Sequence, residues 1–115
     1  MGHRPVPAGT VPRVGETWAI VVAAGSGQRY GGAKQYERLG DRRVIDWSLA
    51  TARQATDGVV AVVADGAPEE AAADRTVTGA DTRSGSVRAG LAAVPEAAEV
   101  VVVHDAARPL ASADL

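Results

Sequence analysis

The stretch W-A-I-V-V-A-A-G-S-G-Q-R, residues 18–29, decides the fold of this chain. Trp18 to Val22 is a short apolar run rich in β-branched residues, which predicts a buried strand. Gly25 and Gly27 follow it, and because glycine lacks Cβ their N–H groups can approach an anion closely. Arg29 and Lys34 add mobile positive charge suited to a triphosphate. Ligands bind at the carboxyl ends of strands in open α/β sheets, so the stretch predicts a phosphate-binding turn.

Two better-known glycine motifs do not fit this turn. A dinucleotide-binding fingerprint needs a third glycine where Tyr30 stands. A P-loop needs Gly-Lys followed by Ser or Thr, but Ala33 separates Gly32 from Lys34, and Gln35 replaces the hydroxyl residue. The turn therefore predicts neither a NAD site nor a P-loop.

Composition limits the class of protein. The chain has 115 residues, enough for one modest domain, of which 46% are hydrophobic and 3% aromatic. Its 12 basic and 14 acidic residues give a net charge of −2, which provides no global field for nucleic acid or a membrane surface. The lack of cysteine excludes disulfides and thiolate metal sites and is compatible with a cytoplasmic location. Residues 1–16 are proline-containing and have no continuous apolar segment, so we expect a flexible leader.

Hydrophobic periodicity after the glycine turn predicts alternating helices and strands. The expected elements are a helix over Val44–Ala55, a strand over Val59–Val63, a short helix over Pro68–Asp74, a strand over Thr76–Thr78, a helix from Ser84 or Gly85 to Val94, and a strand over Glu99–Val103. The valines of the last strand predict a central parallel strand covered on both faces. The order indicates an α/β fold with a mostly parallel sheet, apparently truncated because Leu115 ends the chain where another helix could begin.

Polar residues follow two of these strands. Asp105 comes directly after the valine strand, on the sheet edge predicted for the glycine turn. A carboxylate there can hold Mg²⁺ or cap a turn, and the nearby glycine turn favours the metal. Ser86 could recognise a base or ribose or cap a helix, and Arg83 could contact phosphate or pair with Asp81. His104 is expected to pack or hydrogen-bond rather than act as a base, because no Ser or Cys nucleophile signature accompanies it.

Three separated blocks together resemble the 2-C-methyl-D-erythritol 4-phosphate cytidylyltransferase family. They are A-A-G-S-G-Q-R at 23–29 with K-Q-Y at 34–36, G-A-D-T-R-S-G-S-V-R-A-G-L at 79–91, and V-H-D-A-A-R-P at 103–109. Their order and spacing are more specific than any one block. The resemblance implies a Rossmann-like nucleotidyltransferase fold, with residues 17–115 as the N-terminal, CTP-binding part of the domain.

The resemblance also implies roles for individual residues. Arg29 and Lys34 would stabilise the transition state, although the interval between them is shorter than in the family. Asp105 would bind Mg²⁺. The CTP site would comprise Ala23, Ala24, Gly25, Ser26, Gly27, Ala80, Asp81, Ser86, Ala106 and Arg108.

The implied reaction is transfer of CMP from CTP to 2-C-methyl-D-erythritol 4-phosphate, a polyol phosphate, with release of pyrophosphate, in isoprenoid precursor biosynthesis. The alternatives are ribitol 5-phosphate or another polyol phosphate as acceptor, and a non-catalytic nucleotide-binding fragment. Family members are homodimers, but the C-terminal half that carries their dimer arm, acceptor contacts and another catalytic lysine has no counterpart here. We therefore expect weak or absent cytidylyl transfer from this chain alone.

Overall fold

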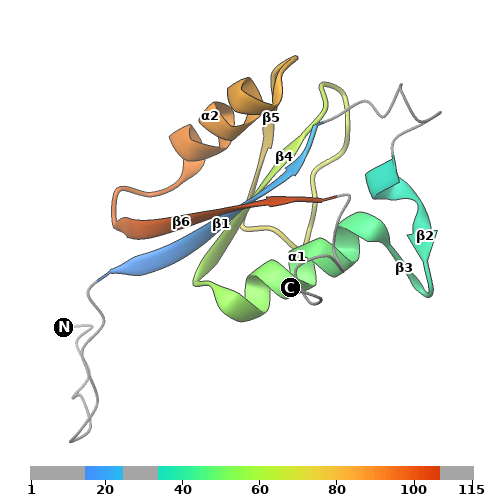
Figure 1. The fold of residues 1–115 in the computed structure, drawn as a ribbon, viewed down its shortest axis with the longest axis horizontal. Coiled ribbons are helices and arrows are strands. Elements are labelled where there is room, and N and C mark those ends of the chain that lie inside the picture. Colours follow the sequence, from blue (N-terminus) through green and yellow to red (C-terminus); the bar gives the residue numbers. More distant parts are fainter. Residues whose placement is uncertain (1–14, 25–33, 107–115) are drawn as a thin grey trace, which may run out of the picture.

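The sheet of this protein is built around β1 (Glu16–Ala23), as a computed structural model of residues 15–24 and 34–106 shows (Figure 1). Four strands lie in the order β5 (Arg75–Thr78), β4 (Gly58–Val63), β1 and β6 (Ala98–Asp105). All three neighbouring pairs are parallel. The predicted α/β fold with a mostly parallel sheet is confirmed.

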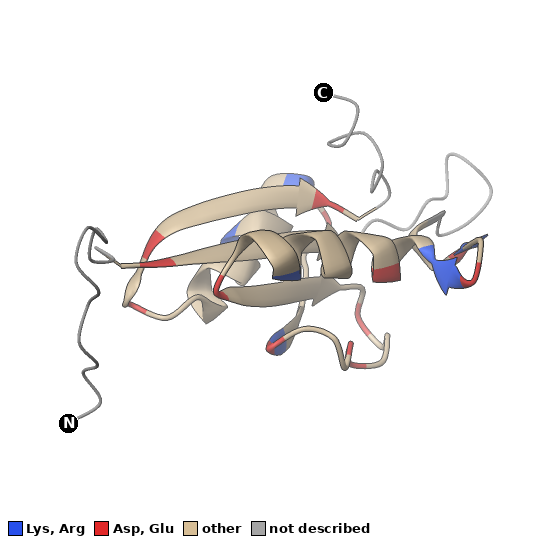
Figure 2. Ribbon diagram, turned by 90° about the horizontal axis from the view of Figure 1, so that it is seen from below, with Lys and Arg blue, Asp and Glu red and all other residues tan. Residues whose placement is uncertain are grey.

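One helix covers each face of the sheet. α1 (Val44–Ala55), whose bounds agree with the prediction, packs Ile45 and Leu49 against the β1 and β4 side chains of one face. α2 (Arg83–Ala93) lies on the other face, where a Cβ added to Gly90 would come within 2.6 Å of Ile20 Cγ2. The strands carry few charged residues between their ends (Figure 2), so the apolar layers pack closely.

A small hairpin precedes α1 and was not expected from the sequence. η2 (Lys34–Tyr36), a 3₁₀ helix, leads into β2 (Arg38–Leu39), which pairs antiparallel with β3 (Arg42–Arg43). Gly40, at the first central position of the turn, has φ of 73°, a conformation that glycine adopts readily. The Gly-Asp pair at the turn is the local signal that identifies it.

The helix predicted over Pro68–Asp74 is wrong, because this segment is irregular, with a turn at Ala71 and Ala72 and a bend at Ala73 and Asp74. Asp74 is held at the sheet: its N–H donates to Val59 O at 2.9 Å, and its Oδ2 accepts from Val59 N at 2.8 Å. The Glu70 N–H donates to Thr76 Oγ1 at 3.0 Å. These non-local bonds outweigh the helix propensity of a few alanines in a segment too short to be stable as an isolated helix.

The valine strand was predicted to be central and covered on both faces, and this is wrong for the described part of the chain. β6 pairs only with β1 there and forms an edge of the sheet. Val100 is 53% exposed and Val102 is 47% exposed, because the helices lie mainly over β1 and β4.

The other predicted elements occur with boundaries shifted by one or two residues. The leader predicted over residues 1–16 lies outside the described residues except at Gly15 and Glu16, and Glu16 begins β1. No helix in the described ranges is both long and apolar enough to cross a membrane.

Candidate functional site

The carboxyl ends of β1 and β6 meet at the point where the strand order reverses. From β1 the chain crosses by α1 to β4 on one side, and from β5 it crosses by α2 to β6 on the other. Right-handed crossovers in opposite directions place the two helices on opposite faces, as Figure 1 shows. Open α/β proteins bind ligands outside the strand ends at such a switch point, the place in the fold called the crevice below.

The first and second sequence blocks come into contact at this crevice. Ala24 follows β1, and Gly79 follows β5. A Cβ added to Gly79 would lie 2.6 Å from Ala24 Cβ and 2.6 Å from Ser86 Oγ, closer than real Cβ atoms approach. Glycine at 79 therefore allows the two strand ends and the first turn of α2 to pack directly against one another.

Ser86 shapes the turn that carries Ala80 and Asp81. Its side chain is 2% exposed, and Oγ accepts from Ala80 N at 3.0 Å and donates to Ala80 O at 3.2 Å. The N-cap of α2 is Thr82, whose Oγ1 accepts from Gly85 N at 3.0 Å. Ser86 is therefore not the N-cap of α2, and Ala80 and Asp81 are exposed at the crevice end of the sheet.

Asp105 connects the second and third blocks through an ion pair. Arg83 Nε donates to Asp105 Oδ1 at 3.0 Å, and Arg83 Nη2 lies 3.5 Å from Oδ2. Arg83 thus pairs with Asp105, not with Asp81 as one sequence alternative had it. The Arg83 and Asp105 side chains are 59% and 39% exposed, so the ion pair is exposed to solvent and stabilises the fold by less than about 1 kcal/mol.

The chemistry of Asp105 fits a hard divalent cation. Its carboxylate is partly exposed at the crevice, and the long contact leaves Oδ2 able to accept another partner. No cluster of three His, Cys, Asp or Glu side chains occurs among residues 15–24 and 34–106. A cation here would rely on one carboxylate together with ligand phosphate oxygens and water, which is how Mg²⁺ commonly binds.

Ala106 fixes the chain just beyond β6. It is fully buried, its N–H donates to Val22 O at 2.9 Å, and its carbonyl accepts from Ser48 Oγ at 2.9 Å. Sequence reasoning missed Ser48, a buried hydroxyl in the apolar stripe of α1. A serine within such a stripe is the signal that could have identified it, because a buried hydroxyl needs a partner.

Lys34 begins η2, and the structure describes its backbone position. The next residue, Gln35, is 5% exposed, and its Nε2 donates to Ala23 O at 2.8 Å. The two described flanks of the glycine turn are therefore joined by a buried hydrogen bond. The predicted site residues Gly25, Ser26, Gly27, Arg29 and Arg108 lie outside the described residues.

Three charged side chains, Arg43, Asp46 and Glu70, form a cluster beside η2. Arg43 Nη2 lies 2.7 Å from Asp46 Oδ1 and 2.7 Å from Glu70 Oε1, and the Glu70 side chain is 4% exposed. These bonds raise the pKa of Arg43, and the bond from Arg43 lowers the pKa of Asp46. The Arg43 guanidinium also lies 5.9 Å from the centroid of the Tyr36 ring. Burial, then the Glu70 charge, raises the pKa of Tyr36.

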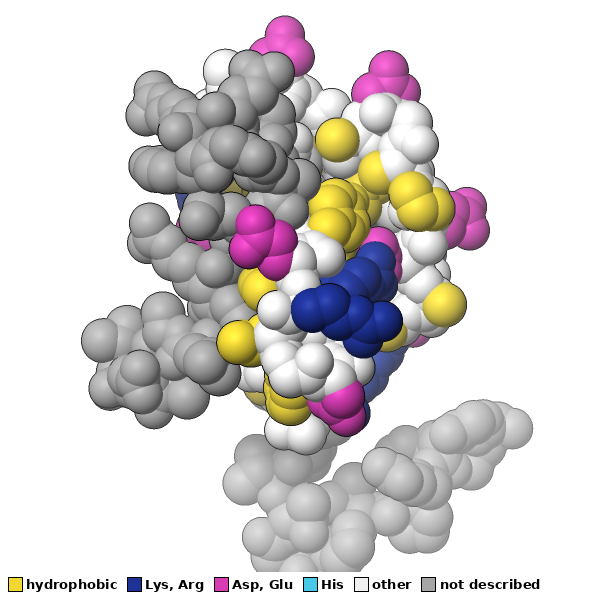
Figure 3. All heavy atoms as spheres, turned by 90° about the vertical axis from the view of Figure 1, so that its right-hand side faces the viewer, with side chains coloured by type: hydrophobic (Ala, Val, Ile, Leu, Met, Phe, Trp, Pro, Cys, Tyr) yellow, Lys and Arg dark blue, Asp and Glu magenta, His cyan; other side chains and the backbone are white. Residues whose placement is uncertain are grey.

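Basic side chains gather at this end of the molecule (Figure 3). The β2–β3 hairpin carries Arg38, Arg42 and Arg43. Arg38 donates to Asp41 O at 2.9 Å, and the Arg42 guanidinium lies 4.9 Å from the centroid of the Trp47 ring. Their contacts maintain the hairpin and the start of α1.

His104 packs beside the site without a visible chemical role. Its Nε2 is buried and has no hydrogen-bond partner among the described residues. Burial lowers its pKa, while the Asp105 charge opposes the shift. The lowered pKa favours the neutral form of the imidazole near pH 7.

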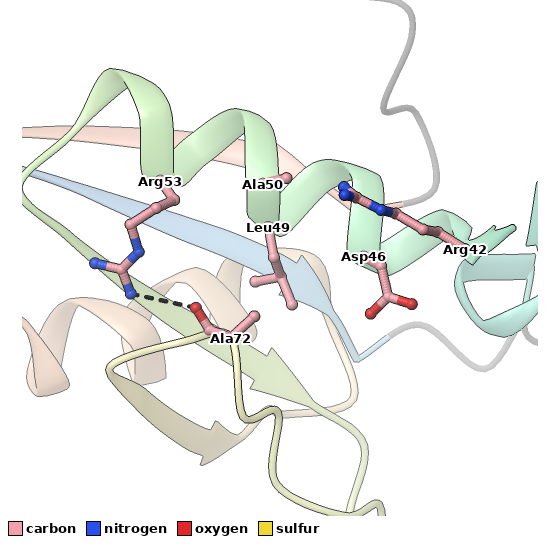
Figure 4. A pocket seen from close by; sticks show the side chains of 6 residues that line it. All are labelled: Arg42, Asp46, Leu49, Ala50, Arg53 and Ala72. Atoms are coloured by element: carbon pink, nitrogen blue, oxygen red, sulfur yellow. Dashed lines mark hydrogen bonds between the residues drawn. The ribbon is translucent and has the colours of Figure 1, made fainter.

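Among the described residues, two cavities lie away from the switch point. One, of about 550 Å³, is lined by residues between Glu69 and Val77, none of which is a predicted site residue. The other measures about 360 Å³ and lies between α1 and the turn segment that precedes β5 (Figure 4). None of the predicted site residues lines it; the residues that do are Arg42, Asp46, Leu49, Ala50, Arg53 and Ala72. Arg53 is already bound to Asp74 at 2.9 Å and to Ala72 O at 3.2 Å. We therefore place the candidate site at the switch point.

Comparison with known proteins shows which family the chain resembles. The family model described as 2-C-methyl-D-erythritol 4-phosphate cytidylyltransferase matches residues 17–115. A bifunctional enzyme IspD/IspF of Dinoroseobacter shibae is 49% identical over 107 residues, covering 84% of this chain and 27% of that protein. A 2-C-methyl-D-erythritol 4-phosphate cytidylyltransferase of Xanthomonas axonopodis pv. citri is 41% identical over 116 residues, covering 88% of this chain and 44% of its own length.

Solved structures share the fold. The 2-C-methyl-D-erythritol 4-phosphate cytidylyltransferase of Thermus thermophilus superimposes with a TM-score of 0.62 at 30% identity, covering 78% of this chain and 41% of that one. A manganese complex of Rv0371C from Mycobacterium tuberculosis H37Rv gives a TM-score of 0.62 at 25% identity, covering 82% and 52%. The chain thus spans less than half the length of the curated relatives named above. It belongs to the 2-C-methyl-D-erythritol 4-phosphate cytidylyltransferase family.

Proposed function

We propose that this chain is the CTP-binding part of a cytidylyltransferase that acts on 2-C-methyl-D-erythritol 4-phosphate. The observation that carries the proposal is the meeting of all three blocks at the switch point, through the packing of Ala24 against Gly79 and the pairing of Arg83 with Asp105. Membership of the family supports CTP as the nucleotide and 2-C-methyl-D-erythritol 4-phosphate as the acceptor.

The crevice is suited to hold the nucleoside at one end and its phosphates at the other. Ala24 and Ala80 offer small side chains that leave room for a base, and Asp81 is exposed next to Ala80. Ala23 and Ala106, which the sequence also assigned to the CTP site, are buried in the core on the α1 side of the sheet, so they would support the site from within the fold. In the proposed reaction an acceptor phosphate oxygen attacks the α-phosphorus of CTP, and the bond to the leaving pyrophosphate breaks. Arg29 and Lys34 would stabilise the charge that develops on the phosphates.

A divalent cation is part of the proposal. Asp105 would hold Mg²⁺, which would neutralise phosphate charge when bound. Two observations support a cation here: the partly exposed carboxylate of Asp105 at the end of β6 and the manganese complex of a structural relative. We further propose a cytoplasmic location. Acceptor binding, full turnover and dimer formation are expected to require the part of the family outside this chain.

Calorimetry with CTP tests the nucleotide site. We expect the chain to bind CTP more tightly with Mg²⁺ or Mn²⁺ than with EDTA, and Asp105→Asn to weaken the cation-dependent binding about tenfold, equivalent to about 1.4 kcal/mol. Glu96→Gln is the matched control, because Glu96 is an exposed carboxylate in the turn that precedes β6, at the opposite end of that strand from Asp105. Absence of CTP binding with and without cation would refute the proposed function.

An assay of pyrophosphate release tests the reaction. The chain alone is expected to release little pyrophosphate from CTP and 2-C-methyl-D-erythritol 4-phosphate. Normal turnover would contradict the need for the rest of the family domain. Turnover with ribitol 5-phosphate in place of the methylerythritol substrate would reassign the acceptor.

A further inference from the structure

Gln35 has a buried polar side chain at the edge of the crevice, and the proposed chemistry gives this side chain no function. Only 5% of the residue is exposed. Its Nε2 donates to the carbonyl of Ala23 at 2.8 Å, across 12 residues of sequence that include the glycine turn. A buried amide at this distance is a well-formed hydrogen bond.

The carbonyl of Ala23 needs such a donor because the sheet ladder ends beside it. Ala23 is the last residue of β1 and lies opposite Val63, the last residue of β4. The preceding carbonyl, of Val22, accepts from Ala106 on the β6 side. Successive carbonyls of a strand point to opposite sides, so the carbonyl of Ala23 points toward β4, whose last residue, Val63, lies opposite Ala23. Gln35 therefore takes the place of a further strand residue.

This bond fixes the position of the Lys34 backbone. Lys34 and Gln35 are adjacent in η2, so a bond from Gln35 to the end of β1 also sets the Lys34 backbone relative to that strand. The Tyr36 side chain packs against the α1-side core and holds the other end of η2.

We propose that Gln35 is a positioning residue that sets the distance from Lys34 to the nucleotide phosphates by binding the Ala23 carbonyl. This rests on the proposed function, since Lys34 must act on phosphates. It predicts that Gln35 contributes to recognition of the triphosphate and not of the nucleoside.

Gln35→Met tests the inference, because methionine has a similar length and volume but no donor. Gln54→Met is the matched control, since Gln54 lies exposed on α1. Calorimetry with CTP and with cytidine measures the two parts of the ligand separately. We expect Gln35→Met to weaken CTP binding about tenfold, as loss of one well-placed charged contact does, and to leave cytidine binding unchanged. Gln54→Met should change neither.

Coupling to Lys34 distinguishes positioning from a general effect on the fold. If Gln35 acts through the lysine, Lys34→Ala and the double variant Lys34→Ala/Gln35→Met should bind CTP equally, because the second change has nothing left to misplace. Hydrogen exchange should also accelerate at the η2 amides in Gln35→Met while the amides of β1 remain protected. A purely structural role would weaken CTP and cytidine alike and add to the loss from Lys34→Ala.

Two results would overturn the inference while leaving the proposed function intact: unchanged CTP affinity in Gln35→Met, or equal losses for CTP and cytidine. If the wild-type chain binds neither ligand, the proposed function fails and the inference fails with it. Should Gln35→Met not fold, Gln35→Asn replaces it, because asparagine keeps the amide but is too short to reach Ala23. It is expected to show the same selective loss of CTP binding.

Discussion

Replacing Gly79 with alanine tests how closely the sequence blocks are packed. The new Cβ would lie 2.6 Å from Ala24 Cβ, 2.6 Å from Ser86 Oγ and 2.9 Å from Val62 Cγ1. Alanine has no rotamer with which to avoid them. Ala24 Cβ is fixed to the backbone at the end of β1, and Ser86 can turn away only by losing its bonds to Ala80.

The expected loss of stability follows from these contacts. Restoring ordinary contact requires movements approaching 1 Å, and overpacking of this kind costs about 1–3 kcal/mol. Gly79 does not have a positive φ, so alanine also restricts the unfolded chain and returns about 0.4–1 kcal/mol. We therefore expect Gly79→Ala to lower the free energy of unfolding by about 1–2 kcal/mol, and Tm by several degrees.

Urea denaturation followed by Trp18 fluorescence measures this change, because Trp18 is 9% exposed in the core. Ala24→Gly provides the compensating variant, since it removes one of the atoms that the new Cβ meets. The double variant Gly79→Ala/Ala24→Gly should be more stable than the sum of the single changes predicts. A Gly79→Ala chain as stable as the wild type, or strict additivity in the double variant, would refute the packing argument.

Three further predictions concern burial and charge. Val62→Ala should lower the free energy of unfolding by about 2 kcal/mol, because the Val62 side chain is fully buried. Val102→Ala should lower it by less than about 0.5 kcal/mol, because Val102 is 47% exposed. Equal losses of stability for the two variants in urea denaturation would contradict the edge position of β6. Because the pKa of His104 is lowered in the folded chain, the unfolded chain binds more protons at pH values below the ordinary pKa of histidine. The free energy of unfolding should therefore fall as the pH decreases from about 6.5 toward the folded-state pKa, by at most about 1.4 kcal/mol per pH unit. His104→Leu should reduce this slope in unfolding measured from about pH 5 to 8. Arg43→Met should lower the free energy of unfolding by about 3 kcal/mol, because it leaves the Glu70 carboxylate buried without its positively charged partner. Adding Glu70→Leu should restore much of the lost stability, as measured by thermal or urea unfolding. If stability is not restored, loss of the ion pair is not the cause of the destabilisation.

Several parts of the fold could be predicted because their signals are local. The apolar stripe of α1 predicted both ends of that helix, and continuous valines predicted that β4 and β6 are strands, of which only β4 is buried. The β2–β3 hairpin also has a local signal, the Gly40-Asp41 pair at its turn, which is typical of a tight hairpin. In contrast, the segment over Pro68–Asp74 carries a local preference for helix, and bonds to residues in β4 and β5 override it.

The sequence by itself determined the alternation of strands and helices, the family, and the three blocks that contain the candidate site. Only the tertiary structure decided the strand order, which places β6 at the edge of the described sheet and its carboxyl end beside that of β1. It also decided the partners of the polar side chains: Arg83 binds Asp105, Ser86 binds the Ala80 backbone, and Gln35 binds Ala23. The reason is physical. Propensity and periodicity depend on neighbours along the chain, whereas a hydrogen bond forms with whichever donor or acceptor the packed sheet brings within about 3 Å.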